Sequence, residues 1–253
     1  MNALKTIIHV HTDYSHDSNW SCEQLVEAAQ RTGVHRVAIT DHNLITGALQ
    51  ARTLAGPRII VGEEISTTDG HIIGLFLEER VPPGLSGEQT ARLIRAQGGL
   101  VLAPHPFATL CEDSLGRAAL ERLLPWLDAI EIYNSQNLFT WDDARARRYA
   151  ARNGLTPYVG ADAHVRGHLD GAHQFLPPFD GPREFLRALS QAQLVPRRFR
   201  LTYFAAMGIR HIWGKVSQRH LGNFGVNAPD SHEADWHTDQ PSTSQPPGQV
   251  ASD

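Results

Sequence analysis

Short apolar, β-branched runs alternate with longer amphipathic stretches along the chain, up to about residue 193. The short runs have the length of strands, and the longer stretches have the period of helices. Expected strands lie at 4–11, 36–40, 58–65, 70–77, 99–103, 129–133 and 156–160. Expected helices lie at 21–33, 45–54, 87–96, 115–123, 142–152 and 182–192. This alternation predicts repeated β-α units around a mostly parallel sheet.

About seven strands with short connections predict an α/β barrel. There are too many helices for a β-sandwich, and no glycine-rich nucleotide fingerprint follows the first strand. We therefore expect one barrel domain over residues 1–200. In such barrels the active site lies at the carboxyl ends of the strands.

The pattern changes after residue 200. Residues 201–221 predict a basic, amphipathic helical segment, and residues 222–253 are rich in Pro, Ser, Gln and Asp and are expected to be disordered. Seven basic and no acidic residues lie between positions 185 and 229, which would suit nucleic acid or an anionic surface. The alternative is a helix that covers the barrel with its arginines in water.

The composition fits a protein with one sizeable core. The 253 residues are 41% hydrophobic and carry a formal net charge of -4. Cys22 and Cys111 form neither a disulfide framework nor a paired metal motif, which favours a reducing, cytoplasmic location. No signal-like start and no run of about 18 apolar residues occurs, so we expect neither secretion nor a transmembrane segment.

Imidazole and carboxylate side chains gather where expected strands end. His9 and His11 are two residues apart on the first strand, so both point to the same face. Asp17 follows in the loop, and the other strand ends carry Asp41-His42, Glu63-Glu64, His105 and Asp162-Ala163-His164. Neutral imidazoles mixed with carboxylates are the ligand set of Zn²⁺, Mn²⁺ and Fe²⁺, and a carboxylate can bridge two such ions.

Five stretches, in the order in which they follow one another along the chain, resemble the PHP (polymerase and histidinol phosphatase) metal-dependent phosphoesterases. They are His9-Val10-His11-Thr12 with Asp17, Ile39-Thr40-Asp41-His42-Asn43, Gly62-Glu63-Glu64-Ile65-Ser66, Ala103-Pro104-His105-Pro106 and Gly160-Ala161-Asp162-Ala163-His164. The likeness runs from residue 7 to about residue 175. It implies a distorted (β/α)7 barrel, in agreement with the strand count.

The resemblance also implies three divalent metal ions (Mn, Zn or Fe). By position, the first would be held by His9, His11, Glu64 and Asp162. Glu64 would bridge to a second ion, held also by His71 and His105. The third would be held by Asp17, His42 and His164. Three divalent cations outweigh the three carboxylates, and a positive site at strand ends suits a phosphate oxyanion.

Four further residues are candidates for a role in catalysis or substrate binding at this site. Asp41 would orient a ligand imidazole. Asn134, at the end of the sixth strand, could contact substrate or form a turn. Arg166 and His168 could clamp phosphate or protonate a leaving group, and the alternative for both is a solvated loop.

We expect a metal-dependent phosphoesterase that attacks a phosphomonoester or phosphodiester with a metal-bridging hydroxide. Its substrate would be a small phosphate ester, a nucleotide or an oligonucleotide end. An amidohydrolase is the first alternative, but many of those enzymes use a carbamylated bridging lysine, and the only lysines here are Lys5 and Lys215. The second alternative is a non-catalytic PHP scaffold. Such domains tend to lose ligands, whereas all nine positions are retained.

Overall fold

A computed structural model describes residues 3–165 and 167–199 of the chain. The predictions for Arg166, for the basic segment 201–221 and for the tail 222–253 concern residues outside this part. Residues 1–200 form one compact unit.

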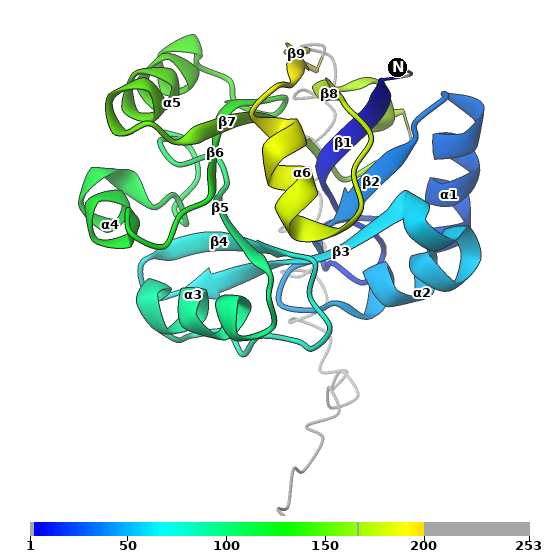
Figure 1. Cartoon of the computed structure of the whole chain (residues 1–253), viewed down its shortest axis with the longest axis horizontal. Helices are drawn as coiled ribbons and strands as arrows, with labels where there is room; N and C mark the ends of the chain where they lie inside the picture. The colour runs from blue at the N-terminus through cyan, green and yellow to red at the C-terminus, as the bar shows by residue number, and fades with distance from the viewer. Residues whose placement is uncertain (1–2, 166, 200–253) are drawn as a thin grey trace, which may run out of the picture. The chain divides into compact units, whose positions relative to one another are not determined.

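Seven strands close into a barrel (Figure 1). They are β1 (Leu4–Val10), β2 (Arg36–Ile39), β3 (Ile59–Thr67), β4 (Gly70–Leu75), β5 (Leu100–Ala103), β6 (Ala129–Asn134) and β7 (Thr156–Ala163). Neighbours in this order are hydrogen-bonded, and β1 pairs with both β2 and β7, which completes the ring. Strand β4 is antiparallel to β3 and β5, whereas the other pairs within the ring are parallel. The predicted distorted (β/α)7 barrel is confirmed.

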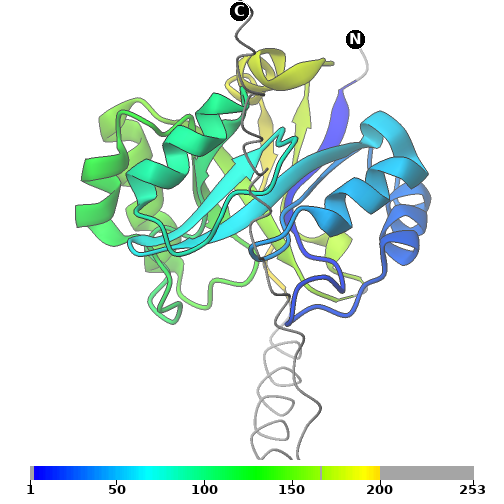
Figure 2. The same ribbon diagram turned by 90° about the horizontal axis from the view of Figure 1, so that it is seen from below.

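Five helices of the described residues cover the outside of the barrel, and the sixth packs against the apolar side chains of its interior (Figures 1 and 2). They are α1 (Cys22–Arg31), α2 (Thr46–Ala55), α3 (Gly87–Ala96), α4 (Gly116–Leu123), α5 (Thr140–Asn153) and α6 (Gly181–Leu189), with single 3-10 turns at Gly56–Arg58 and His168–Asp170. Capping boxes at Ser21 and Ser86 start α1 and α3, because each serine side chain accepts the backbone N–H three residues on. No helix within the described ranges is both long and apolar enough to span a bilayer.

Two short strands lie outside the predicted set. Strand β8 (His173–Leu176) is antiparallel to the first half of β1, and β9 (Gln193–Val195) pairs with β8. Both have four residues or fewer, too few for a clear alternation of apolar and polar positions. They extend the sheet from the amino-terminal end of β1 and leave the carboxyl end free.

The barrel interior is apolar at one end and polar at the other. Each of the seven strands contributes to an apolar cluster that includes Ile8, Ile60 and Tyr158, and Phe185 of α6 packs against the same cluster. A larger cluster, which includes Val10 and Ala163, fills the space between strands and helices. The other end of the interior is therefore left for the polar side chains at the carboxyl ends of the strands.

Candidate metal centre

Nine ionisable side chains lie together at one end of the barrel, where the parallel strands have their carboxyl ends and the antiparallel β4 has its amino end, and we call them the Glu64 cluster. They are His9, His11, Asp17, His42, Glu64, His71, His105, Asp162 and His164. They include every residue that the sequence assigned to metal binding. The structure places them in four overlapping groups, each of which offers ligand atoms within 4.8 Å of one another.

Glu64 lies at the centre of the cluster and is only 1% exposed. Its Oε2 lies 3.1 Å from His9 Nε2 and 3.3 Å from His11 Nε2. Its Oε1 lies 2.9 Å from His105 Nε2 and 3.0 Å from His71 Nδ1. The two oxygens therefore face different pairs of imidazoles, which is the arrangement of a carboxylate able to bridge two ions.

The two other carboxylates of the cluster both lie beside His164. Asp17 Oδ2 is 3.3 Å from His42 Nε2 and 3.0 Å from His164 Nε2. Asp162 Oδ1 is 3.4 Å from His164 Nδ1, and it also lies 3.5 Å from His9 Nε2. His11 and His164 stack with their ring centroids 4.2 Å apart. The loop after β1 thus brings Asp17 to ligands that come from β2 and β7.

The geometry fits divalent ions. Donors bound about 2.1 Å from one ion lie roughly 3.0 to 3.4 Å apart at octahedral and tetrahedral angles, and the separations around Glu64 fall near this range. His11 Nε2 and His105 Nδ1 are buried and make no hydrogen bond within the described part of the chain. A buried imidazole nitrogen that makes no hydrogen bond, although carboxylate and imidazole groups lie close to it, is typical of a metal ligand.

Mutual electrostatics keeps the carboxylates ionised despite burial. Burial opposes the charge of Glu64, but the charge of His9 and hydrogen bonds from His105 and other imidazoles outweigh it, and the pKa of Glu64 lies well below its ordinary value. The pKa of Asp162 is likewise lowered, to about 2, by His9 and His164 against the effect of burial. His11 responds in the opposite way: Glu64 lies 3.3 Å from its Nε2, but burial and the charge of His164 outweigh this carboxylate and lower the pKa of His11 to about 3.

Local backbone distortions aim three of the nine side chains. His9 has φ = 70°, His105 has φ = 22° and Asp162 has φ = 48°, in the left-handed region that non-glycine residues rarely adopt. The β1 pairing register shifts around His9, which marks a bulge. Ile8 and His9 therefore both face the barrel interior. Each such residue costs about 1–3 kcal/mol, and such strain concentrates at functional sites.

Glu131 lies outside the cluster and forms hydrogen bonds with two of its members, His9 and His105. Its Oε1 lies 3.1 Å from His9 Nδ1, and its Oε2 accepts the backbone N–H of His105 at 2.6 Å and the Asn134 side chain at 2.9 Å. Because His9 Nδ1 donates to Glu131, His9 Nε2 is left to face Glu64. Glu131 is not among the residues that the sequence predicts for the site. A single carboxylate within an apolar strand is the signal that identifies it, since a buried charge needs partners.

Asp41 reaches the cluster through Ser15 rather than by direct contact with an imidazole. Asp41 accepts the backbone N–H and the hydroxyl of Thr12 at 2.6 and 2.7 Å, and the hydroxyl of Ser15 at 3.1 Å. Ser15 Oγ in turn lies 3.1 Å from His11 Nδ1. Asp41 therefore fixes the loop that orients His11.

Comparison with known proteins assigns the chain to a family. The model of the PHP domain matches residues 8–239. The chain belongs to the PHP domain family. The five motifs that resembled this family are thus confirmed as a family relationship, and the chain is a metal-dependent hydrolase of the PHP type.

Individual relatives agree with this assignment. An uncharacterised protein of Methanocaldococcus jannaschii is 39% identical over 146 residues, which cover 52% of this chain and 82% of that protein. The phosphoribosyl 1,2-cyclic phosphate 1,2-diphosphodiesterase of Eggerthella lenta is 37% identical over 84 residues, 30% of this chain and 32% of the relative. A two-domain Bacteroides vulgatus protein that contains a predicted PHP-like metal-dependent phosphoesterase has a similar fold, with a TM-score of 0.64 at 19% identity over 78% of this chain and 65% of that one.

Asn134 and His168, which the sequence also predicted for this site, are both buried but lie in different surroundings. Asn134 is 1% exposed, and its side-chain amide donates hydrogen bonds to Glu131 and Asp162. It therefore helps to hold the carboxylate of Asp162 in position. His168 is 7% exposed and stacks on Phe199 with a centroid separation of 3.8 Å. Burial and the charge of His164 lower the pKa of His168 to about 4. The neutral ring is favoured at neutral pH, which argues against a role as proton donor.

Replacing Gly160 should damage the centre through Glu131. A Cβ at position 160 would lie 1.5 Å from Glu131 Oε1, so Gly160→Ala must displace that carboxylate. We expect Mn²⁺ affinity to fall by about 10- to 100-fold, the usual effect of losing a group that orients ligands. Calorimetric titration with Mn²⁺ measures it.

Gly99→Ala is the matched control for that variant. The added Cβ at Gly99 would also crowd a buried backbone, 2.9 Å from the Leu75 carbonyl oxygen, but away from the cluster. It should lower stability and leave Mn²⁺ affinity unchanged. Equal affinity in Gly160→Ala and the natural sequence would contradict the role given to Glu131.

Ion affinity should rise with pH. Burial opposes protonation of His164, but its hydrogen bond to Asp17 and the charge of Asp162 raise its pKa from 6.5 to about 9. The protonated ring therefore stabilises the ion-free fold fully below pH 6.5, and this contribution is lost as pH rises through about 9. An ion binds the neutral ring, so it must displace this proton. Titrations with chelator-buffered Mn²⁺ should show tighter binding at each step between those two pH values, and a pH-independent affinity would refute the expectation.

Proposed function

We propose that this PHP domain hydrolyses a phosphate ester at the Glu64 cluster, with three divalent ions bound there. The observation that carries the proposal is the convergence of three carboxylates and six imidazoles at one end of the barrel. The set carries fewer negative charges than three divalent ions carry positive ones, and a site with an excess of positive charge attracts a phosphate group. When bound, such ions lower the pKa of a coordinated water and polarise a phosphoryl oxygen.

The residues of the chain would have three roles at the ions: bridging, anchoring and orienting a ligand. Glu64 would bridge two ions, since its oxygens face separate imidazole pairs. Asp17 and Asp162 would anchor the ions beside His164. Glu131 would hold His9 with Nε2 toward the ions, as its hydrogen bond to Nδ1 indicates. Mn²⁺, Zn²⁺ and Fe²⁺ all suit this N/O donor set.

The proposed substrate is a small phosphomonoester or phosphodiester, such as a nucleotide or an oligonucleotide end. The Eggerthella relative is named for a phosphodiester, which supports testing diesters beside monoesters. Arg166 as a phosphate clamp, nucleic-acid binding through residues 201–221 and a cytoplasmic location stay predictions.

A substrate screen tests the proposal. We expect the full chain, supplied with Mn²⁺ or Zn²⁺, to cleave p-nitrophenyl phosphate or bis(p-nitrophenyl) phosphate, and to leave p-nitroanilide amides intact. His11→Ala and Asp162→Ala should each lower kcat/KM by about 100-fold or more, because each removes a ligand from the ions that drive the chemistry.

His35→Ala is the matched control for the screen. His35 is exposed, and its Nδ1 accepts the backbone N–H of Lys5, away from the cluster. Its removal should leave the rate unchanged. Turnover that survives both His11→Ala and Asp162→Ala would place catalysis elsewhere, and cleavage of amides alone would favour the amidohydrolase alternative.

A further inference from the structure

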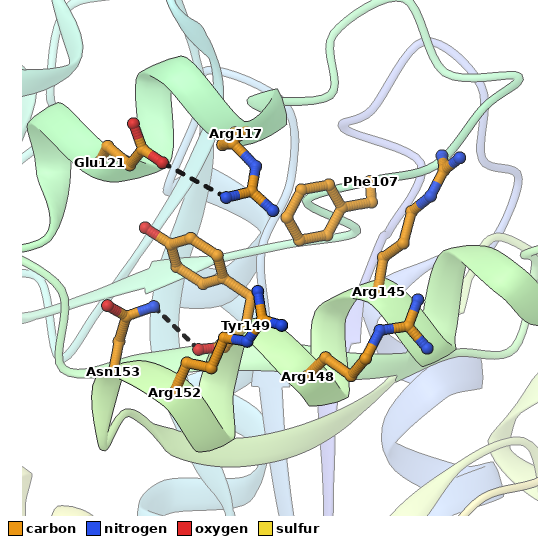
Figure 3. Close-up of a pocket in the computed structure, with 8 residues that line it drawn as sticks. All are labelled: Phe107, Arg117, Glu121, Arg145, Arg148, Tyr149, Arg152 and Asn153. Carbon is orange, nitrogen blue, oxygen red and sulfur yellow. Dashed lines mark hydrogen bonds and ion pairs between the residues drawn. The ribbon is translucent and has the colours of Figure 1, made fainter.

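A second concave site lies between α4 and α5, outside the Glu64 cluster (Figure 3). It has a volume of about 530 Å³, which lies within the usual size range of small-molecule pockets. None of the nine cluster residues lines it. Its walls are instead formed by four arginines, two aromatic rings, one glutamate and one asparagine. We call it the α4–α5 pocket.

The positive charge of the α4–α5 pocket comes from both helices. Figure 3 shows Arg117 on α4 opposite the three arginines of α5. Arg145, Arg148 and Arg152 follow one another at intervals of three and four residues, which places them along one face of α5. All four arginine side chains are exposed and can therefore reach a ligand from solvent.

Only part of this charge is neutralised within the protein. Arg117 lies 3.6 Å from Glu121, the single carboxylate that lines the pocket, and Arg145 lies 3.9 Å from Asp142. Within residues 3–165 and 167–199, neither Arg148 nor Arg152 has a carboxylate oxygen within 4.0 Å. The α5 wall thus presents two guanidinium groups that have no ion-pair partner among the residues that the structure describes.

A buried hydroxyl adds a second, independent sign of a ligand. Tyr149 lines the pocket, is 6% exposed, and its hydroxyl has no hydrogen-bond partner within the described residues. Buried polar groups without a partner are rare and call for an explanation. Its ring meets that of Phe107 edge to face, with centroids 5.8 Å apart.

We infer that the α4–α5 pocket binds a small polyphosphate anion, a chain of two or three phosphoryl groups that is either free or carried by a nucleoside. Guanidinium groups bind phosphate oxygens in a bidentate manner. Side chains three or four residues apart on a helix are about 5–6 Å apart at Cβ. Arg145, Arg148 and Arg152 therefore match adjacent phosphoryl groups better than a single one. Because the site is a pocket between two helices, a compact ligand suits it better than a continuous nucleic-acid strand.

Binding measurements on ion-free protein test this inference separately from catalysis. The full chain, stripped of metal with EDTA and dialysed, is titrated by calorimetry with ADP, with inorganic tripolyphosphate and with a single-stranded decanucleotide. We expect ADP or tripolyphosphate to bind, and Arg148→Gln/Arg152→Gln to weaken that binding by at least tenfold. Comparison of the two ligands identifies the source, since tighter binding of ADP indicates a nucleoside and tighter binding of tripolyphosphate indicates the free chain.

A matched double variant controls for total charge. Arg183→Gln/Arg187→Gln removes two exposed arginines at the same spacing on α6, and it should leave both affinities unchanged. Thermal melting followed by circular dichroism confirms that both variants fold. Equal losses in the two double variants, no binding of either polyphosphate, or binding of the decanucleotide alone would overturn the inference. Phosphatase activity should be the same in both double variants and in the natural sequence, so this test can fail while the proposed function stands.

Discussion

A carboxylate at the centre of a protein is stable only if charged or hydrogen-bonding groups surround it. Glu64 meets this condition with imidazoles from β1 and β4 and from the segments that follow β2 and β5. The carboxyl ends of the parallel strands and the amino end of the antiparallel β4 must therefore lie at the same level, with their polar side chains turned inward. The apolar layer beneath, formed by residues such as Ile8 and Tyr158, sets that level by filling the barrel up to the cluster.

The Glu64 cluster is held in place by groups that lie outside it. Glu131 fixes His9 and the backbone at His105, and Ser15 connects His11 to Asp41. The left-handed backbone at His9, His105 and Asp162 has an energetic cost that the packed barrel around it must offset. We interpret the strain and the supporting hydrogen bonds as two parts of one preorganised ligand shell.

Sequence patterns predicted the barrel and the convergence of eight of the nine side chains, because both depend on local signals, whereas His71 was implied only by the resemblance to the PHP family. Strand length, the spacing of helices and the polar residues at strand ends are all visible in the sequence. The bulge at His9, the two strands after β7 and the role of Glu131 were not predicted, since each depends on contacts between distant residues. Equal spacing on an ideal strand would have pointed Ile8 and His9 to opposite faces.

The contrast between local signals and contacts between distant residues also explains which properties of Asn134 and His168 could be predicted. Asn134 was correctly placed at a strand end, but only the folded structure shows that it is buried against Asp162 and Glu131. His168 is near the cluster in space, as its position after β7 suggested, yet burial keeps its ring neutral. Proximity can be read from strand order, whereas burial and protonation depend on what packs against each side chain.

The most direct test of the account is to locate the ions. Crystals of the full chain grown with Mn²⁺ should show anomalous scattering peaks at coordination distance from Glu64, with further ligands drawn from His9, His105 and Asp162. Elemental analysis of the same material should find bound metal in at least stoichiometric amount. Protein that takes up no Mn²⁺, Zn²⁺ or Fe²⁺, or that shows peaks only away from Glu64, would contradict the central claim.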